Sequence, residues 1–470
     1  MQKIIIKNFG AIKYAEIEIK KTLVLIGEQA SGKSTIAKLI YFFKTIKDDL
    51  FSQIYRDKNH SNLEPYSDIV YPTRQKFQNF FGSTSRFSDF EIIFYYSIEK
   101  DKFLKLTIDE NKTLRTNFSP NLLNNDNFKT SASSIKRRIQ QRLNENNIRG
   151  QLQLFDEEEK IRYAQQLYTL LNESFESNQT NSLFIIAGRN ATLSYSDLFE
   201  KYLFASISED DRNEISERNK RKIQTIDETL MLQFMKNVVN TKDTFKKFGN
   251  FEGLIDDNAE NKAKLYLIKN RINEILKGEY IIDFDGSEKI MLNTEAEEYV
   301  YLANASSGQQ ESIRILQDIF LNILDNAKVL RILEEPEAHL FPIAQKQLIE
   351  LLSLMVNQND DNQLIITTHS PYVLTVFNNL LFANRVVEKN PSAESEVTEI
   401  IPQDCWLSAK DFSAYSLGNQ SVAENTNYCE PIFNTEKGTI KQNYLDTVSE
   451  ILGGDFQALY SIHAKTFARR

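Results

Sequence analysis

Short apolar runs alternate with polar turns near the N-terminus and predict strands there. Three of these runs are rich in β-branched residues, and they occupy residues 2–7, 14–19 and 22–26. We expect them to form a small meander. Residues 34–44 place apolar side chains at helical spacing, so the third run is followed by a loop and a helix. Two later runs, 91–97 and 103–108, predict a hairpin.

A long polar stretch, from about residue 120 to residue 275, separates the two apolar parts of the chain. It is rich in Asn, Gln, Lys and Glu, and its pattern predicts helices over 156–176 and 211–237. One apolar run, Leu183–Gly188, interrupts it and predicts a buried strand that leads to Arg189. We therefore expect a mainly helical insertion.

Regular patterns resume after this stretch. Strands are predicted at 280–283 and 299–303, and a helix of twenty residues at 307–326. Two apolar strands follow, 329–333 and 364–367, and polar residues stand at the carboxyl end of each. In an α/β sheet the functional site lies at these carboxyl ends.

Charge and composition narrow the function classes. The 470 residues carry 56 Lys plus Arg against 65 Asp plus Glu, a net charge of -9, so nucleic acid would have to bind a local basic patch. The candidate patch within the insertion comprises Lys136, Arg137, Arg138 and Arg142, although such a cluster on a helix is usually a solvated face.

Cysteine and histidine are too scarce for a zinc cage or a disulfide framework. The chain has two cysteines, Cys405 and Cys429, and four histidines. No apolar stretch reaches the length of a membrane span and no signal peptide precedes the first strand, so we expect a cytoplasmic protein without membrane contact.

The glycine loop has the spacing of a phosphate-binding loop. The segment GEQASGKS fits the pattern GxxxxGK[ST] between a predicted strand and a predicted helix, and the alternative is a glycine turn that caps an ordinary helix. Backbone N–H groups at the start of a helix bind phosphate. Lys33 would reach the β- and γ-phosphates of ATP and Ser34 would bind Mg²⁺. The nucleotide-binding candidates are Gly27, Glu28, Gln29, Ala30, Ser31, Gly32, Lys33, Ser34 and Thr35.

Two glutamates and a histidine follow the apolar strands. Adjacent residues of a strand point to opposite faces, so Glu334 can bind Mg²⁺ while Glu335 orients and deprotonates the attacking water. His369 can donate a hydrogen bond to the γ-phosphate. Taken alone, each of these residues is more often structural.

The segment ASSGQQE stands at the start of the predicted helix 307–326. Its small and hydroxylated residues suit either an ordinary N-cap or the binding of a phosphate. The candidates here are Ser306, Ser307, Gly308 and Gln309.

Four motifs in this order resemble the ATP-binding-cassette (ABC) class of P-loop ATPases. GEQASGKS resembles its Walker A motif, ASSGQQE its signature motif, ILEEPEAHL its Walker B and D-loop region, and TTHSP its switch histidine. IIIKNFGAI, and SSGQQ together with EEPEAHLFP, resemble the OLD and SMC-like branch, and LFIIAGR and the tail resemble stand-alone ATPase subunits of anti-phage systems such as Septu and PARIS.

This resemblance implies an α/β fold, an ABC-type P-loop ATPase head with a mixed sheet plus a mainly helical insertion. Its N-terminal lobe would occupy residues 1–115, the insertion 116–278 with one strand near 183–188, the C-terminal lobe 279–385 and an α/β extension 386–470.

The function implied is an ATP- and Mg²⁺-dependent switch that forms a head-to-tail dimer or higher oligomer around ATP. It would control a separate effector such as a nuclease, and DNA or a phage protein could be the trigger. The alternatives are an SMC-like DNA repair or maintenance ATPase, a self-sufficient OLD-type nuclease and the nucleotide-binding subunit of a transporter.

Some residues depart from the family pattern. Phe341 stands where relatives have a second histidine, Glu334 stands where many have aspartate, and neither Gln75 nor Gln78 follows a clear strand as a Q-loop glutamine should. The pair Asp283 and Asp285 precedes a glycine and predicts a hairpin turn, not a nuclease site.

Overall fold

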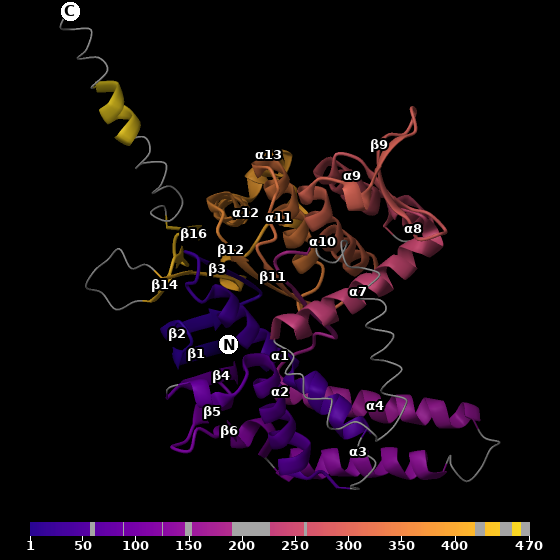
Figure 1. Ribbon diagram of the computed structural model, residues 1–470, viewed down its shortest axis with the longest axis vertical. Helices are drawn as coiled ribbons and strands as arrows, with labels where there is room; N and C mark the ends of the chain where they lie inside the picture. The colour runs from indigo at the N-terminus through magenta and orange to yellow at the C-terminus, as the bar shows by residue number, and fades with distance from the viewer. Residues whose placement is uncertain are drawn as a thin grey trace, which may run out of the picture.

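The run that begins at Thr22 has no polar face, because both sides of its strand are covered. It forms β3 (Thr22–Gly27) in a six-stranded sheet of order β14-β13-β3-β12-β11-β7 in the computed structural model (Figure 1). The structure describes residues 1–470 except 57–61, 88, 125, 146–152, 190–225, 258–260, 419–427, 442–453 and 462–470. The other strands of this sheet are β7 (Asn181–Ile185), β11 (Val329–Glu334), β12 (Gln363–Thr368), β13 (Phe412–Leu417) and β14 (Cys429–Pro431).

All strands of this sheet except β14 run parallel, and their side chains enter two hydrophobic clusters in alternation. Val24 lies in the cluster formed with α10, α11 and α12, whereas Leu23 and Leu25 lie in the cluster on the opposite face. The period of two along a strand produces this alternation, and burial of both faces explains the apolar runs. The helices named here are α10 (Ser307–Leu324), α11 (Pro342–Asn357) and α12 (Pro371–Lys389).

A second, antiparallel sheet of order β2-β1-β4-β5-β6 covers the other face. The β1–β2 hairpin and the β4–β5 hairpin confirm two predictions, but β3 does not continue the meander. β2 alternates exposed and buried residues, while β3 is apolar throughout and pairs with the parallel strands. The bounds are β1 (Gln2–Phe9), β2 (Ile12–Ile19), β4 (Glu91–Ser97), β5 (Lys102–Ile108) and β6 (Leu114–Phe118).

The helix after the glycine loop is longer than predicted. α1 (Lys33–Arg56) extends past residue 44 because Ile46, Leu50 and Ile54 continue its buried stripe. It packs between the two large sheets together with α2 (Tyr71–Phe81), which carries both Gln75 and Gln78.

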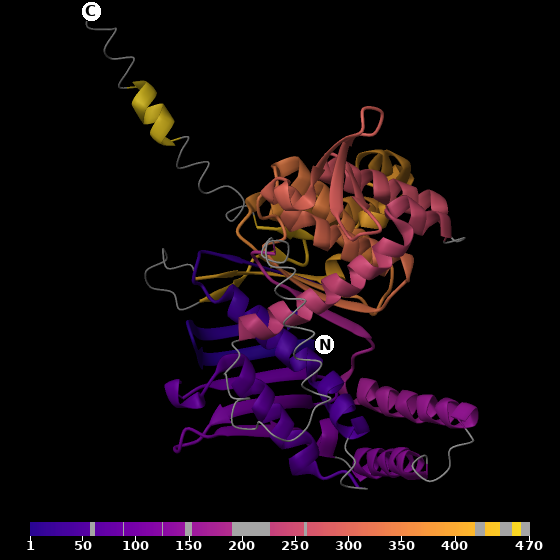
Figure 2. The same cartoon turned by 45° about the vertical axis from the view of Figure 1, so that its right-hand side comes forward.

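The expected insertion contains helices, but its strand belongs to the main sheet. α3 (Asp126–Glu145) and α4 (Gln153–Phe175) lie side by side in both views, and β7 pairs with β11 (Figures 1 and 2). α7 (Ile226–Phe248) contains the end of the helix predicted at 211–237, whose first residues lie outside the described part. α7 passes β7 to reach α8 (Phe251–Asp257), and α9 (Lys262–Leu276) follows.

Two small sheets complete the described strands. β8 (Glu279–Ile282), β9 (Glu288–Asn293) and β10 (Glu298–Tyr301) form one, and β15 (Phe433–Asn434) with β16 (Thr439–Ile440) forms the other. The Asp283 carbonyl accepts from the Gly286 N–H at 2.9 Å between β8 and β9, which confirms the predicted turn. α13 (Glu394–Ile400) follows α12. Among the described helices we find none that combines the length and apolarity needed to cross a membrane.

The segment expected to be a C-terminal extension enters the six-stranded sheet. β13 lies parallel to β3, with Gly27 opposite Leu417. A strand this far from β3 in the chain can join it because Phe412, Ala414 and Leu417 are buried. The last part of the chain therefore helps to position the glycine loop.

Candidate ATP site

The carboxyl ends of three parallel strands, β3, β11 and β12, bring the predicted residues to one edge of the sheet. Thr368 pairs with Ile26, and Thr367 pairs with Glu334. The glycine loop, the glutamate pair and His369 all follow directly after these strand ends. Parallel strands in register place consecutive motifs side by side, which residue spacing alone does not show.

The glycine loop turns in a space that a side chain would fill. A Cβ at Gly27 would lie 2.3 Å from the carbonyl oxygen of Leu417, and one at Gly32 would lie 2.9 Å from Ile12 Cγ1. Gly32 also has φ +85°, a region that favours glycine. These glycines let the backbone turn tightly before α1, whose first N–H groups are the phosphate-binding element of a P-loop.

Lys33 is the buried cation of the loop. Its Nζ donates to the carbonyl oxygens of Gly27 and Glu28, each at 2.7 Å. Burial lowers the pKa of Lys33, and the carboxylates of Glu335 and Glu337 oppose that shift. A phosphate group brought to this amine would offset its desolvation, so the loop is suited to an anion.

The two glutamates occupy different environments. Glu334 ends β11 and is buried, and its Oε1 has no hydrogen-bond partner among the described residues. An unpartnered buried carboxylate oxygen is costly unless a cation or donor meets it. This oxygen therefore fits a role in holding Mg²⁺, with the Ser34 hydroxyl as the other candidate.

Glu335 and His369 face each other at the open side of the site. Glu335 Oε1 lies 3.2 Å from His369 Nε2, and their side chains are 41% and 34% exposed. Glu335 adopts φ +44°, a left-handed conformation that costs energy for a residue with a Cβ. Strain of this kind persists where surrounding contacts hold it, and it often occurs at active sites.

Glu337 was not among the predicted site residues. Its Oε1 accepts from the Thr368 hydroxyl at 2.5 Å and from the His369 N–H at 3.1 Å, so it orients the backbone that carries the histidine. Burial raises the pKa of Glu337, which these two hydrogen bonds oppose. Its position in EEPEAHL, three residues after Glu334, was the available signal.

The segment with the signature pattern caps α10. The Ser306 side chain and Gln309 form a reciprocal capping box, and Gln309 Nε2 donates to the Leu276 carbonyl oxygen at 2.6 Å. A Cβ at Gly308 would lie 2.7 Å from the His339 carbonyl oxygen, so this helix start adjoins the D-loop region. Ser306 and Ser307 are exposed. In the described part of the chain, no hydrogen bond or ion pair joins residues 305–309 to residues 27–35.

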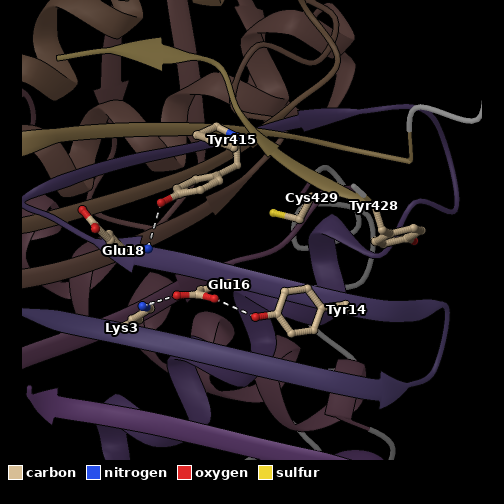
Figure 3. Close-up of a pocket in the computed structure, with 8 residues that line it drawn as sticks. Lys3, Tyr14, Glu16, Glu18, Tyr415, Tyr428 and Cys429 are labelled. Carbon is tan, nitrogen blue, oxygen red and sulfur yellow. Dashed lines mark hydrogen bonds and ion pairs between the residues drawn. The ribbon is translucent and has the colours of Figure 1, made fainter. Parts of the chain in front are cut away.

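The C-terminal segment also touches the glycine loop, a contact that no local sequence pattern predicts. The Tyr428 hydroxyl donates to the Ser31 carbonyl oxygen at 2.6 Å. Tyr428 also lines a cavity of about 240 Å³ between β2 and β13–β14 (Figure 3). The residues that line the cavity are Lys3, Tyr14, Glu16, Glu18, Tyr415, Tyr428, Cys429 and Pro431.

Polar groups around this cavity are paired within the antiparallel sheet and, through Tyr415, across to the parallel sheet. The Tyr14 hydroxyl donates to Glu16 Oε2 at 2.6 Å, and Lys3 forms an ion pair with Glu16 (Figure 3). The Tyr415 hydroxyl accepts from the Glu18 N–H at 2.9 Å. The bond between Glu18 and Tyr415 joins the antiparallel sheet to β13, which pairs with the strand before the glycine loop.

Gly418→Ala should weaken ATP binding although Gly418 lies outside the Walker A pattern. Gly418 has φ +81°, and a Cβ there would lie 2.7 Å from Ser31 Cβ, so the loop would have to shift. Gly438→Ala is the control, because Gly438 has φ +66° but its nearest atom would be 3.7 Å away. Each change should destabilise the fold by about 1–2 kcal/mol, whereas only Gly418→Ala should weaken ATP binding, about tenfold. Thermal unfolding and nucleotide titration measure both effects, and equal affinities would argue against the contact.

The candidate basic patch is smaller than its sequence indicated. Lys136 is fully buried, and its Nζ donates to Asp68 Oδ2 at 2.8 Å. Asp68 lies near α2, so the sequence could not show this pairing. Arg137 and Arg138 are exposed. Lys136 is therefore a structural cation, and its assignment to a surface patch was wrong.

Comparisons with known proteins identify the family. The Smc head bound to the C-winged helix domain of ScpA is 13% identical, covers 80% of this chain and 90% of its own, and gives a TM-score of 0.33. A second similar structure is an Smc head domain with an extended coiled coil, bound to the C-terminal domain of ScpA from Pyrococcus furiosus. It is 13% identical, covers 80% of this chain and 92% of its own, and gives a TM-score of 0.32. The SMC head domain from Thermotoga maritima is 11% identical, with coverages of 80% and 90% and a TM-score of 0.32. Scores this low carry no argument about this chain.

A search of curated proteins finds no match. The family AAA_15, described as an AAA ATPase domain, matches residues 1–374. This match covers the glycine loop, the glutamate pair and His369. The chain belongs to this family of AAA ATPase domains.

Proposed function

We propose that the protein is an ATP-operated switch: it dimerises around ATP and Mg²⁺, hydrolyses ATP, and controls a separate effector that acts on nucleic acid. The observation that carries the proposal is the edge of the parallel sheet, where Lys33, the glutamate pair and His369 meet. The two alternatives that share this site are the SMC-like DNA-maintenance ATPase and the self-sufficient nuclease.

In the proposed reaction, each residue acts from the position that the fold gives it. When bound, ATP would supply the γ-phosphoryl group that is transferred to water with ADP as the leaving group, and Mg²⁺ would offset the negative charge of the phosphates. Lys33 would bind the β- and γ-phosphates, and Ser34 with Glu334 would hold the metal. Glu335 orients the attacking water and accepts its proton, and His369 donates a hydrogen bond toward the γ-phosphate.

The proposed dimer accounts for the exposure of several residues. Glu335, His369, Ser306 and Ser307 are all accessible, and Phe341 beside the D-loop is 75% exposed. The start of α10 is a helix N-terminus, which favours an anion, and it is not joined to the glycine loop of its own chain. A second copy placed head to tail would bring this helix to the other subunit's nucleotide.

The proposed effector is a nuclease, as in the stand-alone ATPase subunits of anti-phage systems that the sequence resembles. Within the described residues, no group of three or more His, Cys, Asp and Glu side chains is placed to hold a metal ion. We infer a two-component arrangement from the resemblance. An effector can respond to ATP only if it binds the ATP-closed dimer and the open form with different affinities.

The purified full-length chain tests this proposal directly. With ATP and Mg²⁺ it should hydrolyse ATP and sediment as a dimer, and plasmid DNA should stay intact with Mg²⁺ or Mn²⁺. Lys33→Ala should weaken ATP binding at least tenfold, because a charge-assisted hydrogen bond to phosphate contributes about 1.5–3 kcal/mol. It should also remain monomeric with ATP. A chain that cuts DNA alone in a metal-dependent way would favour the self-sufficient nuclease.

A further inference from the structure

We propose that Arg189 is a positioning residue, which holds the backbone of the Glu334–Glu335 pair and joins it to the start of α10 through Glu311. This inference rests on the proposed ATP site, since it assigns a structural support to the residue that would activate water. Arg189 ends the segment LFIIAGR, for which the sequence suggested no chemical role, and it lies more than 140 residues before the glutamates in the sequence.

The strand before Arg189 brings it to the carboxyl edge of the sheet. β7 runs parallel to β11, with Ile185 opposite Leu333, so the chain after Ile185 passes beside Glu334. The Arg189 side chain is fully buried. A buried guanidinium is stable only when its donors are matched by acceptors, so the partners of Arg189 define its role.

Two of its nitrogens bind the backbone of the glutamate pair. Nη1 donates to the Glu334 carbonyl oxygen at 2.8 Å and to that of Ile186 at 2.8 Å. Nη2 donates to the Glu335 carbonyl oxygen at 3.0 Å. The Glu335 N–H donates in turn to the Thr367 carbonyl oxygen at 2.9 Å. Both peptide groups of Glu335 are thus fixed, which holds its left-handed φ of +44°.

The third nitrogen of the guanidinium binds the signature segment. Nε lies 3.2 Å from Glu311 Oε2 and donates to the Glu311 carbonyl oxygen at 3.3 Å. The Arg189 backbone N–H also donates to Glu311 Oε2, at 3.2 Å. Glu311 is buried in the first turns of α10, five residues after the N-cap Ser306. The Arg189 side chain therefore links the start of α10 to the backbone of Glu334 and of Glu335, the proposed base.

The planar guanidinium is required for this geometry. Its donors point in fixed directions in one plane, so Nε can face Glu311 while Nη1 and Nη2 face the two carbonyls. A lysine amine is a single point and cannot reach all three acceptors. In the proposed dimer the start of α10 faces the other subunit's nucleotide, so Arg189 ties Glu335 to that contact.

The test compares Arg189→Lys with Arg331→Lys in the full-length protein. Arg331 lies on β11, is equally buried, and binds Asp318 and Asn322 but not the glutamate backbone. Arg189→Lys should lower kcat about 10²-fold because small displacements of a catalytic group are costly, while the Kd for ATP stays within about threefold. Arg331→Lys should lower the melting temperature similarly and keep kcat within about threefold.

Glu311→Gln tests the link to α10. It removes the charge that faces Nε and leaves Arg189 in place, so it should lower kcat, as Arg189→Lys does. The double variant Arg189→Lys with Glu311→Gln should lose less than the product of the single effects, because both act through one network. Losses that multiply independently would overturn the link, as would equal losses of kcat in the Arg189 and Arg331 variants.

Hydrogen exchange separates this inference from the proposed function. The amides of Glu335 and Ala338 bind the carbonyls of Thr367 and Glu335, so they report on this segment without any ATPase assay. They should exchange faster in Arg189→Lys than in the wild type or in Arg331→Lys. Unchanged exchange would overturn the inference even in an active enzyme, and faster exchange in a chain without ATPase activity would reject only the proposed function. If Arg189→Lys does not fold, exchange in Glu311→Gln decides the question in the same way.

Discussion

Glu335→Gln should bind ATP and Mg²⁺ normally and hydrolyse ATP about 10²–10⁴-fold more slowly, the range that a general base contributes. Glutamine keeps the shape of the side chain but cannot accept a proton. Glu334, the proposed metal ligand, is buried and points into a different environment, so it should keep its function. Nucleotide titration measures binding, and phosphate release measures turnover.

The control for this substitution is Glu388→Gln. Glu388 lies in the last turn of α12, at the opposite end of that helix from His369, and its side chain is 47% exposed. It loses the same charge at a similar exposure, so its ATPase rate should equal that of the wild type. Unchanged turnover in Glu335→Gln would remove this residue from the mechanism. Loss of ATP binding instead would place it among the binding residues.

A mixture of Lys33→Ala and Ser306→Arg subunits should recover hydrolysis that neither variant has alone. If the start of α10 acts on the other subunit's nucleotide, each mixed dimer contains one site with an intact Lys33 and an intact Ser306. If half of the dimers are mixed, activity should approach about a quarter of the wild-type value per subunit, because each mixed dimer has one complete site out of two. Phosphate release from the mixture and from each variant measures this.

The mixing experiment also has a result that would contradict a site shared between subunits. If Ser306 served the nucleotide of its own chain, every subunit in the mixture would carry one defect in its own site. Activity would then remain at the level of the separate variants at every ratio. Sedimentation with ATP shows in parallel whether mixed dimers form, so failure to pair is distinguished from failure to complement.

Most of the elements could be predicted, because their signals are local. The apolar stripe of α10 and the β-branched run of β12 each lie within a few turns or residues of chain, and the structure places both where expected. The predicted meander was wrong at its third strand. β3 pairs with β12 and β13 because burial of both its faces favours the parallel sheet over β2.

Contacts between side chains and segments far apart in the chain could not be predicted in the same way. Tyr428 binds the carbonyl of Ser31 from the opposite end of the chain, and Lys136, which reads as a surface base, is buried against Asp68. In the sequence, neither Tyr428 nor Lys136 stands in a pattern that indicates its partner. Only the fold shows which acceptor stands beside the donor.

By itself the sequence determined the glycine loop, the glutamate pair, the histidine and the capping segment, because phosphate binding and helix capping depend on residues a few positions apart. The tertiary structure decided how these pieces are held together. Parallel pairing of β7 with β11 puts Arg189 against Glu335, and β13 puts Gly418 against the glycine loop. Contacts between segments so far apart in the chain depend on the order of strands in the sheet, and local patterns do not encode that order.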